Sequence, residues 1–128
     1  MTTDGKNILV IEDDEAAAEL MEMLLMSVGY RVTVAHSAED ALVGFSDAGY
    51  HLVVTDLNMP GMGGAEGIIE FRKLTPEVPV IVVSASYRAM SPEEAARAAK
   101  EIGATAVLAK PFEFDDLTGL VADVLGRP

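Results

Sequence analysis

The sequence contains no cysteine and no tryptophan, and only 9 of its 128 residues are Lys or Arg. Without cysteine the chain has neither a disulfide framework nor a thiolate metal site, which is compatible with a reducing cytoplasm. The formal net charge of -12 argues against a nucleic-acid-binding surface, because phosphate contacts need clustered Lys and Arg. No apolar run approaches the roughly 20 residues of a membrane span, and the N-terminus has no apolar signal region. We therefore expect a cytoplasmic protein that binds neither nucleic acid directly nor membrane.

The length and the hydrophobic content fit one domain. Half of the residues are hydrophobic, which is enough to bury a single core. We expect this domain to cover residues 1–128, with 1–5 as a loose N-terminal tail and 126–128 as a tail or the start of a linker. The acidic surface keeps such a domain soluble, and an acidic face for a basic partner is the alternative.

Short apolar runs alternate with segments of helical spacing along the whole chain. Runs of this kind are typical of strands that are buried on both faces. They are Ile8–Ile11, Val32–Ala35, Leu52–Thr55, Val78–Val83 and Ala106–Ala109. The segments between and after them place apolar residues at i, i+3 and i+4, as in Leu117, Leu120, Val121 and Val124. A strand–helix unit used five times predicts right-handed crossovers, a parallel sheet and the doubly wound strand order 2-1-3-4-5.

Residues at the ends of the helical segments support this assignment. Ser91-Pro92-Glu93-Glu94 has the pattern of a capping box with Pro at the first helical position. Ser37 is expected to cap the second helical segment. Gly29, Gly49 and Gly103 follow the first, second and fourth segments, where a left-handed residue is common.

Acidic side chains follow the first and third predicted strands. Glu12, Asp13 and Asp14 come after the first strand, and Asp56 ends the third. In the predicted strand order these two strands are neighbours, so the acids meet at one sheet edge. Helix capping accounts for one of them, which we assign to Asp14, but the others would repel one another unless a cation lies among them. All-oxygen ligands favour Mg²⁺, and the carbonyl of Asn58 is a further candidate ligand.

Two more strands bring polar groups to the same edge. Ser84 ends the fourth strand, and Lys110 follows the fifth and precedes Pro111. The alternatives are a turn-forming role for Asp56, a surface role for Lys110 and local backbone bonding by Ser84. A carboxylate, a divalent ion, a lysine and a hydroxyl together form a site for phosphoryl transfer, in which the carboxylate attacks in line. The product would be an acyl phosphate.

These motifs resemble those of response-regulator receiver domains of two-component signal transduction. The resemblance covers roughly Lys6 to Leu125. It rests on the order of four motifs: Ile8–Asp14, Asp56-Leu-Asn-Met-Pro-Gly61, Ser84-Ala85 and Lys110-Pro-Phe112. It implies a flavodoxin-like (βα)5 fold and a domain that switches or relays a signal, with an output partner or output domain.

The resemblance also implies roles for the site residues. Asp56 receives the phosphoryl group from a phosphohistidine of a sensor histidine kinase or a histidine phosphotransfer protein. Asp13 and Asp56 bind Mg²⁺ through their side chains, Glu12 through water and Asn58 through its carbonyl. The remaining two residues, Ser84 and Lys110, hold the phosphoryl group. The domain is then no separate enzyme but a phosphoacceptor that assists its own phosphorylation and dephosphorylation.

One position departs from the family pattern. Three residues before Lys110 the family often has an aromatic switch residue, and here that residue is Val107. We expect activation without an inward aromatic movement, and Tyr87 is an alternative switch residue. Two alternative functions are a degenerate receiver used only for protein binding and an aspartate-nucleophile phosphohydrolase. The first would normally have lost a site residue, and the second usually has its paired acids two residues apart on the first strand.

Overall fold

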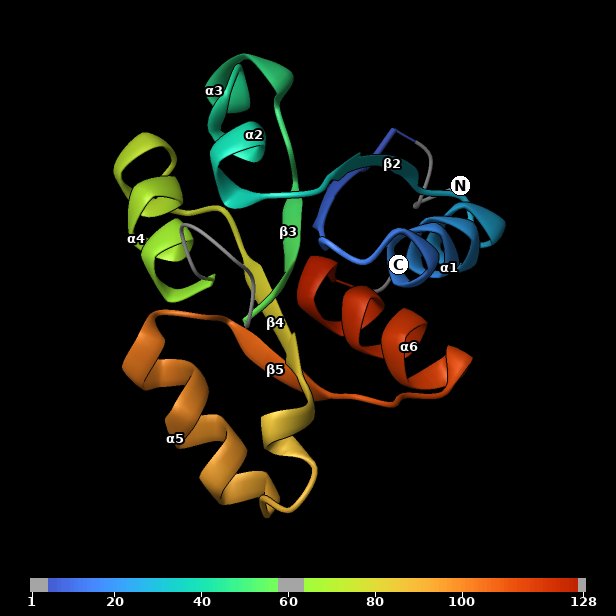
Figure 1. Cartoon of the computed structure of the whole chain (residues 1–128), viewed down its shortest axis with the longest axis vertical. Helices are drawn as coiled ribbons and strands as arrows, with labels where there is room; N and C mark the ends of the chain where they lie inside the picture. The colour runs from blue at the N-terminus through green and yellow to red at the C-terminus, as the bar shows by residue number, and fades with distance from the viewer. Residues whose placement is uncertain (1–4, 58–63, 127–128) are drawn as a thin grey trace.

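The computed structural model describes residues 5–57 and 64–126, which contain a five-stranded parallel sheet (Figure 1). The strands are β1 (Asn7–Ile11), β2 (Arg31–Ala35), β3 (Leu52–Asp56), β4 (Val80–Ser84) and β5 (Ala106–Ala109). Their order is β2-β1-β3-β4-β5, which confirms the predicted order. All four neighbouring pairs are parallel. The carboxyl ends of the strands therefore lie at one edge of the sheet.

Helices cover both faces of this sheet. Figure 1 shows α1 (Glu15–Ser27) and α6 (Phe114–Leu125) on one side of it. On the other side lie α2 (Ala38–Leu42), α3 (Phe45–Ala48), α4 (Gly64–Leu74) and α5 (Pro92–Ile102). None of the helices in the described ranges is long and apolar enough to span a bilayer.

The two layers of helices create two hydrophobic cores, one on each face of the sheet. Alternate residues of one strand belong to different cores because side chains alternate across a strand. Ile8 and Val10 pack against Met21 and Leu25 of α1, whereas Leu9 belongs to the core on the opposite face. The central strands β3 and β4 are buried throughout, and the edge strands β2 and β5 are partly exposed. The apolar runs at the two edges are thus only partly buried.

The second helical segment differs from the single helix that the repeated strand–helix unit predicts. It forms the two short helices α2 and α3. Val43, the residue after α2, is extended, and Gly44 follows with φ +68° in the left-handed region. A side chain at Gly44 would be strained in this conformation, so glycine permits the break.

The predicted helix ends are confirmed. Ser91 and Glu94 form the capping box at the start of α5, and the Ser37 side chain accepts a hydrogen bond from the Asp40 N–H at the start of α2. Gly29, Gly49 and Gly103 all have positive φ. Asp14 caps α1 by accepting a 2.8 Å hydrogen bond from the Ala17 N–H.

Candidate functional site

Four strands bring polar residues to the carboxyl edge of the sheet. Glu12 follows β1, Asp56 ends β3, Ser84 ends β4 and Lys110 follows β5. Backbone hydrogen bonds hold these ends in place, because the Glu12 N–H donates to the Ala35 carbonyl at 3.0 Å and the Lys110 N–H donates to the Ser84 carbonyl at 3.1 Å. The peptide bond between Lys110 and Pro111 is cis. Residues that are 98 positions apart in the sequence thus meet at one point.

Lys110 connects two acids that come from different strands. Its Nζ lies 2.5 Å from Glu12 Oε1 and 3.3 Å from Asp56 Oδ2. The Glu12 side chain is only 1 % exposed, and its Oε2 also accepts a hydrogen bond from the Asp14 N–H at 3.2 Å. The lysine is therefore directed into the carboxylate cluster, as predicted, and is not a free surface residue.

Burial and charge compete within this group. Burial raises the pKa of Glu12, and the nearby charge of Asp56 raises it further, although the hydrogen bonds from Lys110 and Asp14 oppose the change. Burial also disfavours the charge of Lys110, but its hydrogen bonds and its attraction to Glu12 and Asp56 outweigh this effect and raise the pKa of Lys110. One ammonium group thus faces two carboxylates, and a further cation would find excess negative charge here.

Three acids at this edge could hold a metal ion. Glu12, Asp13 and Asp56 each offer one carboxylate oxygen, and these oxygens lie within 4.8 Å of one another. The set contains oxygen alone, which suits a hard divalent ion such as Mg²⁺. Asp13 is exposed, so the group opens to solvent. The predicted ligand Asn58 lies outside the described residues.

Ser84 and Tyr87 belong to the segment that follows β4. Ser84 is buried, and its hydroxyl accepts a hydrogen bond from the Ser86 N–H at 3.1 Å and donates one to Ser86 Oγ at 3.1 Å. It thereby caps the short 3₁₀ helix η1 (Ala85–Tyr87). Tyr87 is already buried, and Val107 packs against the hydrophobic core that contains it. The local bonding alternative for Ser84 is thus observed, alongside its predicted position at the site edge.

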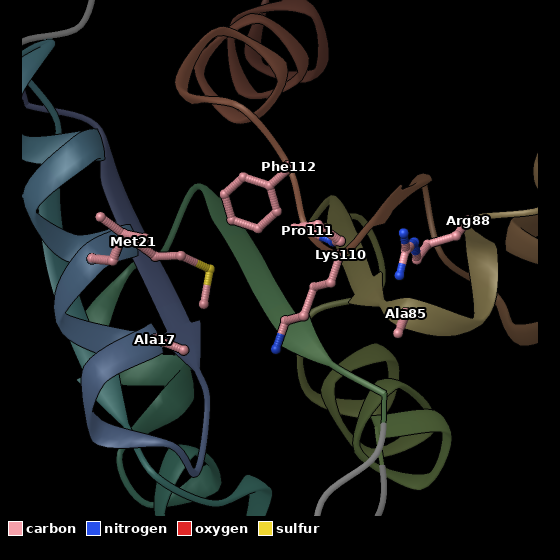
Figure 2. Close-up of a pocket in the computed structure, with 8 residues that line it drawn as sticks. Ala17, Met21, Ala85, Arg88, Lys110, Pro111 and Phe112 are labelled. Carbon is pink, nitrogen blue, oxygen red and sulfur yellow. The ribbon is translucent and has the colours of Figure 1, made fainter.

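A cleft of about 340 Å³ lies beside Lys110 (Figure 2). Its lining comes from α1, from η1 and the residue after it, and from the segment after β5. The lining residues are Ala17, Leu20, Met21, Ala85, Arg88, Lys110, Pro111 and Phe112. Arg88 could not be predicted from the sequence to line a cleft, because a single arginine in a connecting segment carries no periodic or motif signal.

Comparison with known proteins decides the family. The family model of the response regulator receiver domain matches residues 8–122. The chain belongs to this family. Receiver domains are phosphoacceptor modules of signal transduction, and the confirmed strand order is that of their flavodoxin-like fold.

Similar receiver domains occur in longer proteins. This chain is 33 % identical over 119 residues to the uncharacterized transcriptional regulatory protein YkoG of Bacillus subtilis. The match covers 93 % of this chain and 50 % of that protein. The chain is 34 % identical over 127 residues to the transcriptional regulatory protein ZraR of Escherichia coli, covering 99 % of this chain and 28 % of that protein. The chain thus spans half or less of these curated relatives.

Solved structures show the same fold. The receiver domain of the sensor histidine kinase PA1611 from Pseudomonas aeruginosa, with a magnesium ion coordinated in its active site cleft, has a TM-score of 0.82 and 27 % identity. That match covers 95 % of this chain and 98 % of the other. The response regulator TrrA from Thermotoga maritima, in complex with Mg²⁺ and BeF, has a TM-score of 0.78 and 31 % identity. Here 93 % of this chain and 98 % of the other are covered.

Proposed function

We propose that Asp56 is the phosphoacceptor of this receiver domain and that its donor is the phosphohistidine of a histidine kinase or a histidine phosphotransfer protein. The observation that carries the proposal is the contact of one ammonium group, Lys110 Nζ, with both Glu12 and Asp56. Asp56 lies at the tip of a central strand, and its carboxylate oxygen lies within 4.8 Å of those of Glu12 and the exposed Asp13. The Asp56 side chain is itself 12 % exposed, and we propose that the phosphoryl group reaches it from the side of Asp13.

The transfer step forms one bond and breaks one. A carboxylate oxygen of Asp56 attacks the phosphorus atom, and the P–N bond to the donor imidazole breaks in line with the attack. The bonding electron pair stays on the imidazole nitrogen, which takes a proton from solvent water, so the donor leaves as neutral imidazole. The product is an aspartyl phosphate on Asp56, and its hydrolysis by water returns the free carboxylate and inorganic phosphate.

Glu12, Asp13 and Asp56, together with the carbonyl of Asn58, are the residues that would hold Mg²⁺. When bound, this ion would neutralise charge on the phosphoryl oxygens and on the acids. The clustered carboxylate oxygens of this chain support the assignment, as do the magnesium-containing structures of PA1611 and TrrA. The Asp14 side chain takes no part, because it caps α1.

Lys110 and Ser84 are proposed to hold the phosphoryl oxygens. Lys110 is held as a cation at the acceptor by Glu12 and Asp56. Ser84 ends β4 beside the strand that carries Asp56, because Val83 of β4 pairs with Asp56 in the sheet. The domain would thereby assist its own phosphorylation and dephosphorylation without acting on a separate substrate.

The donor protein is proposed to dock beside the acceptor, over α1 and the cleft. Leu20 lines the cleft and is 49 % exposed, and Met23 one turn later on α1 is 63 % exposed. Two exposed apolar side chains on one helix next to an apolar cleft favour a protein partner. We place the domain, as one unit over 1–128, in the cytoplasm, where its phosphorylated state acts on an output domain or partner.

Labelling with a small phosphodonor tests the acceptor. The purified chain is incubated with Mg²⁺ and acetyl phosphate, and intact-mass spectrometry measures the addition of one phosphoryl group. We expect labelling of the wild type and of the cap variant Asp14→Asn, but none of Asp56→Asn. Equal phosphate uptake by Asp56→Asn would refute the assignment of the acceptor.

A further inference from the structure

The cleft beside Lys110 has an unusual charge for this chain. The whole sequence carries a formal net charge of -12, yet among the described residues the lining of the cleft includes two cations and no acid. The other six lining residues are apolar: two Ala and one each of Leu, Met, Pro and Phe. Lys110 is already balanced by Glu12 and Asp56, so the positive charge that the lining offers to a partner is that of Arg88. An apolar cleft with such a cation at its edge is complementary to a group that combines an apolar part with an anion.

The two cations of the cleft differ in their partners. Lys110 Nζ is occupied by Glu12 and Asp56. Arg88 is exposed, and its guanidinium makes no hydrogen bond or ion pair with any residue in the described ranges 5–57 and 64–126. Figure 2 shows the Arg88 side chain extending from the segment after η1 toward Lys110 and Pro111. Arg88 is thus the cation of the cleft that is available to a partner.

The short helix η1 connects Arg88 with Ser84 at the carboxyl edge of the sheet. Ser84 caps η1, and the Arg88 N–H donates to the Ala85 carbonyl at 3.2 Å, directly after that helix. A molecule that fills the cleft therefore contacts both Lys110 and Arg88, which line it. Because Lys110 contacts Asp56, such a molecule lies next to the phosphoacceptor.

We propose that Arg88 is a specificity-determining residue that pairs with a carboxylate side chain on the phosphodonor protein, while an apolar neighbour of that carboxylate enters the cleft. This inference rests on the proposed function. Arginine binds a carboxylate through two parallel hydrogen bonds, which restricts the orientation of the partner as well as attracting it. Arg88 takes no part in the transfer step itself. It acts on docking, so it selects among donor proteins.

Phosphotransfer kinetics test the proposal. Purified histidine kinases and phosphotransfer proteins are first autophosphorylated or charged with [³²P]phosphate, and the donor with the highest kcat/KM toward the wild-type chain is used. We expect Arg88→Ala to lower kcat/KM for this donor about tenfold and Arg88→Glu about a hundredfold, mainly through KM. Labelling by acetyl phosphate, which has no docking surface, should change by less than about twofold under the same electrostatic reasoning.

Arg97 provides a matched control. It is an exposed arginine on α5 that does not line the cleft. Arg97→Glu makes the same change in net charge as Arg88→Glu, so it should leave transfer from the donor protein unchanged. Equal effects of the two variants would show that net charge alone matters, and this would overturn the proposal.

Charge exchange identifies the partner residue. Each Asp or Glu near the donor histidine is changed to Arg in turn, and one of these donors should restore transfer to Arg88→Glu while transferring poorly to the wild type. Rescue by none of them, or an equal slowing of acetyl phosphate and protein transfer by Arg88→Ala, would overturn the proposal. Phosphate uptake by Asp56→Asn would instead refute the proposed function, so the two failures are distinguishable.

A measurement without a donor protein uses N-acetyl-leucyl-glutamate as the probe and N-acetyl-leucyl-glutamine as its neutral match. In NMR titrations the glutamate probe should shift the signals of Ala85, Arg88 and Phe112 more than the glutamine probe does. The difference should disappear in Arg88→Ala. Identical shifts with both probes would contradict recognition of the carboxylate.

Discussion

At the scale of single residues, Lys110 is the side chain on which the site depends in the absence of metal. It contacts a Glu12 carboxylate that is 1 % exposed, although its own side chain is 28 % exposed. A carboxylate that loses its partner in a buried position costs much more than a surface ion pair contributes. The same lysine also keeps an ammonium group next to Asp56, the proposed phosphoacceptor.

Replacement of Lys110 by alanine should therefore destabilise the metal-free protein. We expect a loss of about 2 kcal/mol in the free energy of unfolding, which is below the 3–5 kcal/mol typical of fully buried pairs because Lys110 is partly exposed. Urea unfolding in EDTA measures it. Lys73→Ala is the control. Lys73 Nζ also forms an ion pair, at 3.1 Å from Glu70 Oε2, but both side chains lie at the surface. That variant should lose less than about 1 kcal/mol, and equal losses would contradict the argument.

At the scale of elements, Arg72 fastens helix α4 to the opposite edge of the sheet. Its Nη1 donates to the Val78 carbonyl and, at 3.4 Å, to the Pro76 carbonyl, and its Nη2 donates to the Gly103 carbonyl at 2.9 Å. These carbonyls belong to the segments before β4 and β5. One guanidinium thus connects the end of α4 with the starts of two strands.

Loss of this connection should reduce stability without changing phosphorylation. Arg72→Ala should lower the free energy of unfolding by about 2 kcal/mol, because the hydrogen bonds involve a charged donor. Arg72→Lys should recover only part of the loss, since lysine lacks the planar fork. Urea unfolding gives the stability, and acetyl phosphate labelling gives the activity. A change in the labelling rate of the folded variant would show that Arg72 also influences the acceptor edge.

The short helix η1, directly after β4, bears on how the domain could switch. Tyr87 ends η1 and is already buried, and Val107 packs against the core that holds it. An inward movement of Tyr87 is therefore not available as a switching step. The position three residues before Lys110 has no ring that could take that role.

Activation should then proceed with Tyr87 retained in the core. Mg²⁺ and BeF₃⁻ mimic the phosphorylated state, and aromatic NMR spectra with and without them report on the tyrosine rings. We expect the ring of Tyr87 to keep its contacts with the core, as should the ring of Tyr30, which is equally buried in the core on the other face of the sheet. Contacts between the Tyr87 ring and Ser84 Oγ that appear only with BeF₃⁻ would refute this.

The strands, the helix caps and most of the site could be predicted from the sequence, because they depend on local patterns. Apolar runs located the strands, and the strand order then brought Lys110 to Glu12 and Asp56. The break at Gly44 was not predicted, because a glycine within a helical segment does not by itself reveal that it is left-handed. Nor did the sequence predict that Phe45, directly after the break, stacks on Phe71 with ring centroids 4.8 Å apart. Such a contact between distant residues leaves no local signal.

At the scale of the whole molecule, a net charge of -12 opposes folding by self-repulsion, and three of the acids lie together at one edge of the sheet. Monovalent salt screens repulsion everywhere on the surface, whereas a bound divalent ion acts at one place. The two effects can be separated, because neighbouring acids have different roles. Asp13 belongs to the cluster of candidate ligands, and Asp14 caps α1.

Thermal unfolding should show this difference. At matched ionic strength, MgCl₂ should raise the Tm of the wild type more than NaCl does, since an ion at ten times its Kd contributes about 1.4 kcal/mol through binding to the folded state. Asp13→Ala should lose this excess because its Mg²⁺ affinity falls sharply. Asp14→Ala should keep the excess but start from a lower stability, by about 1 kcal/mol, because α1 loses its cap. Scanning calorimetry measures the Tm values, and titration calorimetry measures the affinities. An unchanged Mg²⁺ affinity in Asp13→Ala would reject Asp13 as a ligand. If both variants lost the extra rise in Tm with MgCl₂, Mg²⁺ would be acting on the total negative charge at this edge of the sheet and not through Asp13.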